Sequence, residues 1–303
     1  MYPLAVMFPK VQRVQFPLSR DQVMLLMAAA NLILLGLETY IAHLISGTIV
    51  PYEWIPITFG PIAGVILLIA GLIALRNRPL ATILASFVFV ASIVIGILGA
   101  YFHLARAMMP YALPGEQISV PLLVWAPPVL GPFTFALVGL LGLSAAWIED
   151  PPDSGTLILL GDYRLRLPYS KTRAYFFITG MGALATVISS VLDHARTDFS
   201  NPWLWVPTAI GIFATVVATG MGFTGKPFRS DYFIYTTAML LMILAGVLGT
   251  GLHILQDLTS LREVVLERFI RGAPLLAPLL FADIGTIGLI ALLDPVERRD
   301  KEP

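Results

Sequence analysis

The residues best suited to chemistry in this chain of 303 residues are its four histidines, His43, His103, His194 and His253. They form two pairs, because His194 follows His43 by 151 residues and His253 follows His103 by 150. Neutral imidazole is the commonest metal ligand among protein side chains, and histidines on facing helices can hold a haem iron from both sides. The spacing therefore predicts two equivalent ligand pairs, one in each half of the chain.

Small residues lie four and seven positions before most of these histidines, on the same face of a helix. They leave a shallow strip in which the edge of a flat macrocycle fits, so we expect them to face a haem. Close packing between helices, which also favours small residues in membranes, is the alternative. The small residues are Gly36, Thr39, Gly96, Gly99, Ser190, Gly246 and Gly249.

Two arginines and two acids complete the candidate site. Arg106 and Arg196 follow closely after two of the histidines and are expected to pair with haem propionates. Glu38 and Asp283 lie within apolar stretches and have no acidic counterpart in the other half. An acid at mid-bilayer costs about 2.5–3.5 kcal/mol on insertion scales, so both are candidates for proton transfer. For Asp283 the alternative is a protonated side chain that hydrogen-bonds a neighbouring helix.

A copper or zinc ion is the alternative ligand if the two halves bring the imidazoles together. Several carboxylates stand near the histidines in the sequence and would complete such a site. The predicted spans contain few polar groups, however, which disfavours a cation pathway through the membrane. A third interpretation treats the histidines as structural residues of a non-catalytic membrane subunit. The nearby carboxylates are Glu53, Asp193, Asp198 and Asp257.

The elements that must position these residues are membrane helices. Hydrophobic residues make up 57% of the chain and charged residues 13%, about half the charge of a soluble domain. A membrane helix needs about 20 mostly apolar residues, and eight stretches qualify. The sequence therefore predicts an all-α integral membrane protein in a lipid bilayer. The eight stretches are approximately 22–47, 57–75, 80–105, 121–147, 173–194, 204–223, 231–255 and 273–294.

The composition also excludes several classes of function. Equal numbers of basic and acidic residues, 19 of each, leave no excess of positive charge for nucleic acid. The chain has no cysteine, which excludes disulfides, thiolate metal sites and iron–sulfur clusters. It also has no Gly-rich phosphate loop, no nucleophile elbow and no HExxH motif, which disfavours hydrolases and nucleotide-driven pumps.

An internal duplication organises the chain. At a shift of 151 residues, landmark residues of the first half recur in the second. The predicted architecture is two four-helix repeats, 1–150 and 151–303, joined by an acidic, Pro-rich linker. Each repeat has an even number of spans, so both run in the same direction through the membrane. The matched pairs include Pro17 and Pro168, Ser19 and Ser170, Arg20 and Lys171, Trp54 and Trp205, and Gly60 and Gly211.

The basic residues predict the orientation of these spans. Fourteen of the 19 Lys and Arg residues fall on one side of the predicted membrane and five on the other. The side with more basic residues is usually cytoplasmic. Both termini are therefore predicted to be cytoplasmic, with the histidines near the outer face of an inner (plasma) membrane.

The layout of eight spans with one histidine pair in each half resembles that of haem A synthase. The resemblance implies that a haem-modifying enzyme is a further possibility. Here the histidines lie on odd-numbered spans instead of even-numbered ones, and the loop cysteines often found in that family are missing.

The leading hypothesis from the residues is a membrane-embedded di-haem b protein with one bis-histidine haem per repeat. It would pass electrons from membrane quinol to a partner at the outer face, as a single protein or as a subunit of a respiratory complex. Extracytoplasmic handling or transport of copper or zinc is the alternative function.

Overall fold

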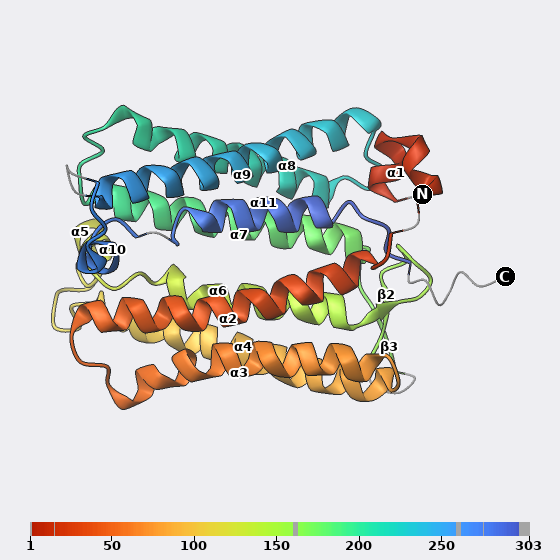
Figure 1. Cartoon of the computed structure of the whole chain (residues 1–303), viewed down its shortest axis with the longest axis horizontal. Helices are drawn as coiled ribbons and strands as arrows, with labels where there is room; N and C mark the ends of the chain where they lie inside the picture. Colours follow the sequence, from red (N-terminus) through yellow and green to blue (C-terminus); the bar gives the residue numbers. More distant parts are fainter. Residues whose placement is uncertain (1, 15, 160–162, 259–261, 275, 297–303) are drawn as a thin grey trace.

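Helices dominate the structure and run side by side along its long axis (Figure 1). The computed structural model describes residues 2–14, 16–159, 163–258, 262–274 and 276–296. Within these residues, six helices are long and apolar enough to cross a membrane, and two shorter apolar helices lie among them. The six are α2 (Arg20–Ser46), α3 (Trp54–Ala74), α4 (Arg78–Arg106), α7 (Lys171–Ala195), α8 (Trp205–Phe223) and α9 (Arg229–Asp257); the shorter two are α6 (Leu130–Ala146) and α11 (Leu279–Ile290).

The fourth and eighth predicted stretches are not continuous helices. In the fourth, the short helix α5 (Val120–Trp125) ends before Pro127 and Pro128, and α6 begins at Leu130. In the eighth, α11 begins only after Pro278. Proline lacks an N–H and disfavours helical backbone at the residue before it, so these prolines interrupt both helices. The hydropathy of the two stretches was therefore a poor guide to their helical length.

Two groups of four helices pack in the same order. In the first group α2 contacts α3 and α6, and α4 contacts the same two helices. In the second group α7 contacts α8 and α11, and α9 contacts the same two. The groups meet through α6 against α7 and α2 against α11. Figure 1 shows the first group in the lower half of the molecule and the second in the upper half.

A small antiparallel sheet joins the two groups. Its strands β1 (Ile148–Glu149), β2 (Thr156–Ile158) and β3 (Arg164–Arg166) pair in the order β1-β2-β3. The turn into β2 contains Gly155, whose φ of +75° is in the region that favours glycine. The linker thus departs from the all-α prediction. The remaining short elements are α1 (Pro3–Met7), η1 (Pro9–Arg13), η2 (Pro51–Glu53), η3 (Pro202–Leu204) and α10 (Leu266–Arg271).

Both ends of the described chain lie at the end of the bundle that carries the sheet, which we call the terminal end (Figure 1). There the backbone N–H of Leu4 donates to the carbonyl of Leu292 at 3.0 Å, and that of Arg20 donates to Asp294 at 2.8 Å. The opposite end carries α5 and α10, and we call it the far end.

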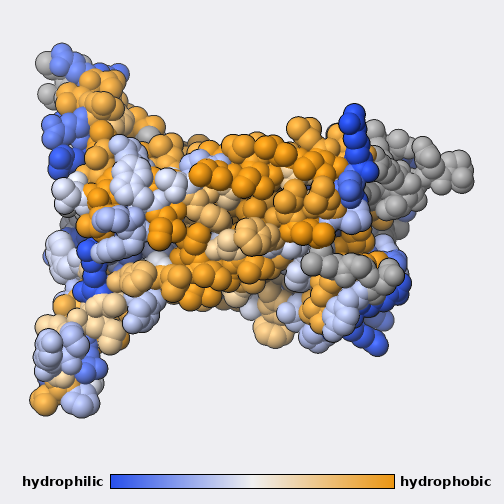
Figure 2. Space-filling model, turned by 90° about the horizontal axis from the view of Figure 1, so that it is seen from below, coloured by the Kyte–Doolittle hydropathy of each residue, from blue (hydrophilic) through white to orange (hydrophobic). Residues whose placement is uncertain are grey.

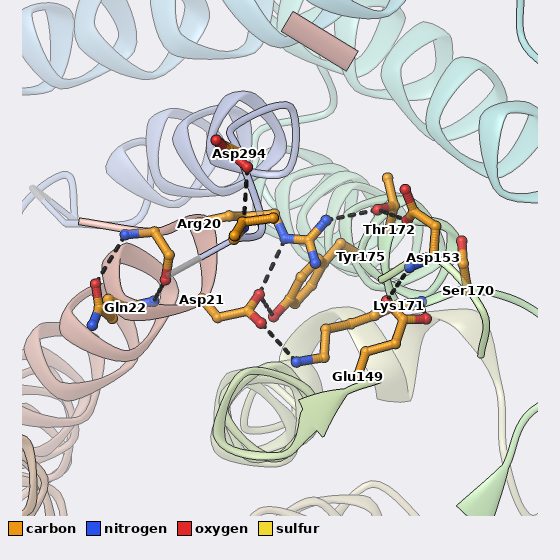
Figure 3. Close-up of polar contacts among 12 residues, drawn as sticks. Arg20, Asp21, Gln22, Glu149, Asp153, Ser170, Lys171, Thr172, Tyr175 and Asp294 are labelled. Carbon is orange, nitrogen blue, oxygen red and sulfur yellow. Dashed lines mark hydrogen bonds and ion pairs between the residues drawn. The ribbon is translucent and has the colours of Figure 1, made fainter. Parts of the chain in front are cut away.

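A buried polar cluster joins α2 and α7 at the terminal end (Figure 3). Arg20 and Lys171 are each only 1% exposed, and both contact Asp21, at 3.1 Å for Arg20 Nε and 2.7 Å for Lys171 Nζ. Tyr175 donates its hydroxyl to the same carboxylate at 2.8 Å, and the Lys171 ammonium also donates to the carbonyl of Trp147. The two basic residues are therefore part of the core and not of the solvated loops.

On the face shown in Figure 2, apolar residues form a band across the middle of the molecule, and polar residues gather toward both ends. Many large apolar side chains of the long helices are exposed, including Leu72, Phe87 and Val216. Such a continuous band of exposed apolar surface fits the hydrocarbon of a bilayer. The chain is a multi-pass membrane protein.

Candidate functional site

All four histidines line one cavity of about 1870 Å³ at the far end of the bundle. His43, His103 and His194 lie in the last turns of α2, α4 and α7, and His253 lies one turn before the end of α9. Helices of both groups form the cavity wall, with α2, α4 and α6 on one side and α7, α9 and α11 on the other. The cavity therefore crosses the boundary between the groups.

The first histidine pair has a spacing that suits a shared metal. The ring centroids of His43 and His103 are 6.2 Å apart, and the ring planes are inclined by 61°. A metal held between two imidazoles, with metal–nitrogen bonds of about 2.0 Å, places the ring centroids roughly 6 Å apart. Glu53, which is 8% exposed, lies beside this pair with Oε1 3.9 Å from His43 Nε2.

Proline carbonyls in the segments before α6 and α11 fix the histidines of α4 and α9. His103 Nδ1 donates to the carbonyl of Pro128 at 2.9 Å, and His253 Nδ1 donates to the carbonyl of Pro274 at 2.8 Å. A carbonyl only accepts, so Nδ1 carries the proton and, in neutral imidazole, Nε2 carries the lone pair. Histidines that ligate metals through Nε2 are commonly held by such a bond at Nδ1.

The histidines of α2 and α7 are held from within their own helices. His43 Nδ1 donates to the carbonyl of Thr39 at 2.8 Å. In α7, Ser190 Oγ lies 3.4 Å from His194 Nδ1. All four Nδ1 atoms thus have a partner in the protein.

The glycines near the histidines mostly serve helix packing. A Cβ at Gly96 would lie 2.4 Å from the backbone nitrogen of Ala136, and one at Gly246 would lie 2.6 Å from that of Ala282. A Cβ at Gly36 would lie 2.3 Å from the ring of Pro61. For these three glycines the neighbouring helix occupies the space that we expected a macrocycle to use.

Gly99 and Gly249 are different, because both line the cavity as well as contacting a proline. A Cβ would lie 2.6 Å from Pro132 Cβ at Gly99 and 3.0 Å from Pro278 Cβ at Gly249. Thr39 and Ser190 also line the cavity. The strip of small residues therefore reaches the cavity only within about one helical turn of each histidine.

The two arginines expected to hold propionates differ in their surroundings. Both line the cavity, but Arg196 donates from Nε to the carbonyl of Val124 at 2.8 Å and from Nη2 to that of Ala126 at 3.3 Å. Arg196 thereby attaches the end of α7 to α5. Arg106 is exposed at the end of α4.

The two intramembrane acids also line the cavity. Asp283 Oδ2 accepts a hydrogen bond from Asn31 Nδ2 at 2.9 Å, which joins α11 of one group to α2 of the other. Asp283 thus bonds a neighbouring helix as an acceptor, and this bond can form with either protonation state of the acid. Glu38 is exposed and borders the cavity two helical turns beyond Asn31. We had not singled out Asn31, although it is a polar residue within an apolar stretch.

Carboxylates and histidines do not gather into a larger cluster. Within the described part of the chain, no three His, Asp or Glu side chains lie close enough together to hold a metal ion. Asp257, which is 3% exposed, accepts a hydrogen bond from the backbone N–H of Ala273 at 2.9 Å and so caps the loop before α11.

No protein-family model, curated protein or solved structure matches the chain.

Proposed function

We propose that this protein is a membrane di-haem electron-transfer protein. His43 and His103 would hold one haem b, and His194 and His253 the other. The observation that carries the proposal is the bond from Nδ1 of His43, His103 and His253 to a backbone carbonyl, combined with the separation of 6.2 Å between the first two rings. Rings held in this way present Nε2 as the ligand atom.

The proposed architecture is eight membrane-crossing segments in two parallel four-helix repeats, 1–150 and 151–303. The identical packing order of the two helix groups supports it. Helix α11, with 12 residues, spans only about 18 Å, less than the bilayer hydrocarbon of about 30 Å. Non-helical backbone is tolerated at membrane depth where it lines a cavity, and Ala273, Pro274 and Ala277 before α11 line this one.

The far end would face away from the cytoplasm, since most basic residues belong to the terminal end. Both haems would then lie near the outer face of an inner membrane. An electron-accepting partner, or another subunit of a membrane complex, would dock at that face.

Two protein ligands on each iron would leave no position for a substrate. A haem in this state changes its charge by one electron without exchanging ligands. The chain's own contribution would be to hold the imidazoles, surround the macrocycles with apolar side chains and place Arg106 at the rim for a propionate. The chemistry is then electron transfer between two haems in one cavity.

An absorption spectrum of the purified protein tests the proposal. A Soret band that shifts on reduction with dithionite is the expected result. Stoichiometric copper or zinc without a Soret band would instead indicate a metal-handling protein. The protein should be purified from cells grown with added iron and haem precursor. If it then shows neither a Soret band nor bound copper or zinc, the histidines have a structural role.

A further inference from the structure

An amide and a carboxylate follow one face of α2, and the equivalent positions of α7 carry neither group. Asn31 and Glu38 are seven residues apart, and therefore two turns apart on the same face. A shift of 151 residues places Gly182 and Ser189 at the corresponding positions of α7. The deep part of the cavity thus has an acidic side, formed by Glu38 of α2 and by Asp283, which bonds Asn31. On α7 and α9 the acids that line the cavity, Asp193 and Asp257, lie nearer the far end, beside His194 and His253.

The deep part of this acidic side offers hydrogen-bond acceptors without a neighbouring cation. Asp283 is held by Asn31, and Glu38 lies between that pair and His43 along α2. The basic side chains among the described residues that line the cavity lie at the far end, on the last turns of α4 and α7 and in α10. They are Arg106, Arg196, Arg268 and Arg271.

The cavity is large enough for more than one ligand. Pockets for a single small molecule usually measure about 300–1,000 Å³, and this one measures about 1870 Å³. Apolar side chains make up most of its wall, and polar side chains gather near the histidines at the far end, with Asp283, Thr179 and Thr186 deeper. A cavity of this kind selects a molecule with an apolar body and a small polar head.

We propose that the acidic side of the cavity binds a lipid-soluble hydroquinone, with one ring hydroxyl donating to Asp283 and the other to Glu38. In their ionised state these two carboxylates only accept hydrogen bonds, so a ligand of that state must supply donors. A hydroquinone supplies two O–H groups on an apolar ring. This inference deepens the proposed function, on which it rests for the electron acceptors.

The oxidation balances with the groups named. The hydroquinone loses two electrons and two protons and becomes a quinone. Each of two ferric haem irons takes one electron and becomes ferrous, while Asp283 and Glu38 each take one proton. After the transfer the protonated acids donate to the quinone carbonyls, so the hydrogen bonds are reversed. Once the two acids have passed their protons on, neither partner has a donor and the quinone leaves.

The asymmetry assigns different tasks to the two histidine pairs. The pair of His43 and His103 lies on the acidic side and receives electrons first. The pair of His194 and His253, whose helix α7 carries Ser189 at the position of Glu38, passes electrons to the partner at the far end.

Single-turnover reduction of the haems tests the inference. Purified protein in lipid nanodiscs is mixed anaerobically with a short-chain hydroquinone, and the Soret shift is followed in time. Glu38→Gln and Asp283→Asn each remove one charged hydrogen-bond acceptor. Each substitution should therefore lower the rate of haem reduction by the hydroquinone about tenfold or more. Both substitutions keep the shape of the side chain, and Asp283→Asn still bonds Asn31. Ser189→Ala at the matched position of α7 is the control and should change the rate less than twofold.

Two further measurements separate this inference from the haem proposal. Haem content and the rate of reduction by dithionite should be unchanged in both acid variants, which excludes a folding defect. Equilibrium binding of a radiolabelled short-chain hydroquinone needs no haem, so it still tests the site if no Soret band is found. Affinity lowered about tenfold in the acid variants supports the site. Equal affinity in all variants overturns it, as would tighter binding of a quaternary ammonium amphiphile with the same tail.

Discussion

Lys171 Nζ of α7 lies 2.7 Å from Asp21 Oδ2 of α2, and the counterparts of these two residues also contact each other. Arg20, the counterpart of Lys171, donates from Nη1 to Thr172 Oγ1 at 2.6 Å, and Thr172 is the counterpart of Asp21. Each helix thus uses its first residue to contact the second residue of the other. Reciprocal contacts of this kind are typical of an interface with two-fold symmetry. Figure 3 shows these contacts between the first turns of α2 and α7, and they agree with the proposed arrangement of two parallel repeats.

The first prediction concerns Asp21, the one carboxylate that contacts both buried cations within the described structure. Asp21→Ala leaves Arg20 and Lys171 buried without their counter-charge. Removing one partner of a buried ion pair costs about 3–5 kcal/mol, so we expect the free energy of unfolding to fall by about that amount. Unfolding in mixed micelles, followed by circular dichroism, measures the loss.

The matched control for Asp21 is Asp150, whose Oδ2 lies 3.9 Å from Arg164 Nη2 at the surface. Both of these side chains are more than half exposed, and exposed pairs contribute about 0–1 kcal/mol. Asp150→Ala should therefore change stability by less than about 1 kcal/mol. Equal losses in the two variants would show that the buried cluster does not hold the groups together.

The second prediction separates packing glycines from open ones. Gly96→Ala places a Cβ 2.4 Å from the backbone of Ala136, so α4 and α6 must move apart. Overpacking of this kind costs about 1–3 kcal/mol. At Gly71 in α3 nothing lies within 4 Å of an added Cβ, so Gly71→Ala should be neutral or stabilise the helix by up to about 1 kcal/mol. The same unfolding assay compares the two, and a neutral Gly96→Ala would contradict the packing role.

The sequence predicted the long helices well because apolar length is a direct requirement of the bilayer. It did not predict the breaks in helical backbone near Pro127, Pro128 and Pro278. Hydropathy is averaged over a stretch, and the average does not detect residues that break the backbone hydrogen-bond pattern. These breaks matter for the site. They bring the carbonyls of Pro128 and Pro274 to the histidine rings, and the path of a loop is not encoded in residue spacing.

Glycine spacing also gave an ambiguous prediction, because close packing and room for a ligand both require small side chains. Gly96 and Gly246 pack against helices, whereas Gly99 and Gly249 also reach the cavity. The bond between Asn31 and Asp283 depends on how α2 and α11 are rotated. Rotation is set by packing across the two groups, so no local pattern predicts it.

The third prediction concerns orientation. The chain has no cysteine, so a single introduced cysteine reports its own side of the membrane. Glu116→Cys at the far end should react with a membrane-impermeant maleimide in intact cells, and Gly225→Cys at the terminal end should react only after lysis. Both positions are exposed. The reverse labelling pattern would place the histidine cavity on the cytoplasmic side.

The fourth prediction concerns the independence of the two histidine pairs. His103→Ala removes one ligand of the first proposed haem and leaves His194 and His253 in place. Haem content per protein, measured as the pyridine haemochrome, should fall by about half, because each proposed iron keeps only its own two imidazoles. Adding His253→Ala should remove the remainder.

The control for His103 is Tyr101, which lies two residues earlier in α4, is 63% exposed and does not line the cavity. Tyr101→Ala should leave the haem content unchanged. Complete loss of haem from His103→Ala alone would mean that both pairs serve one shared group, because the cavity crosses the boundary between the helix groups. Full retention would mean that His103 is not a ligand, and its bond to the Pro128 carbonyl would then serve only to attach the loop to α4.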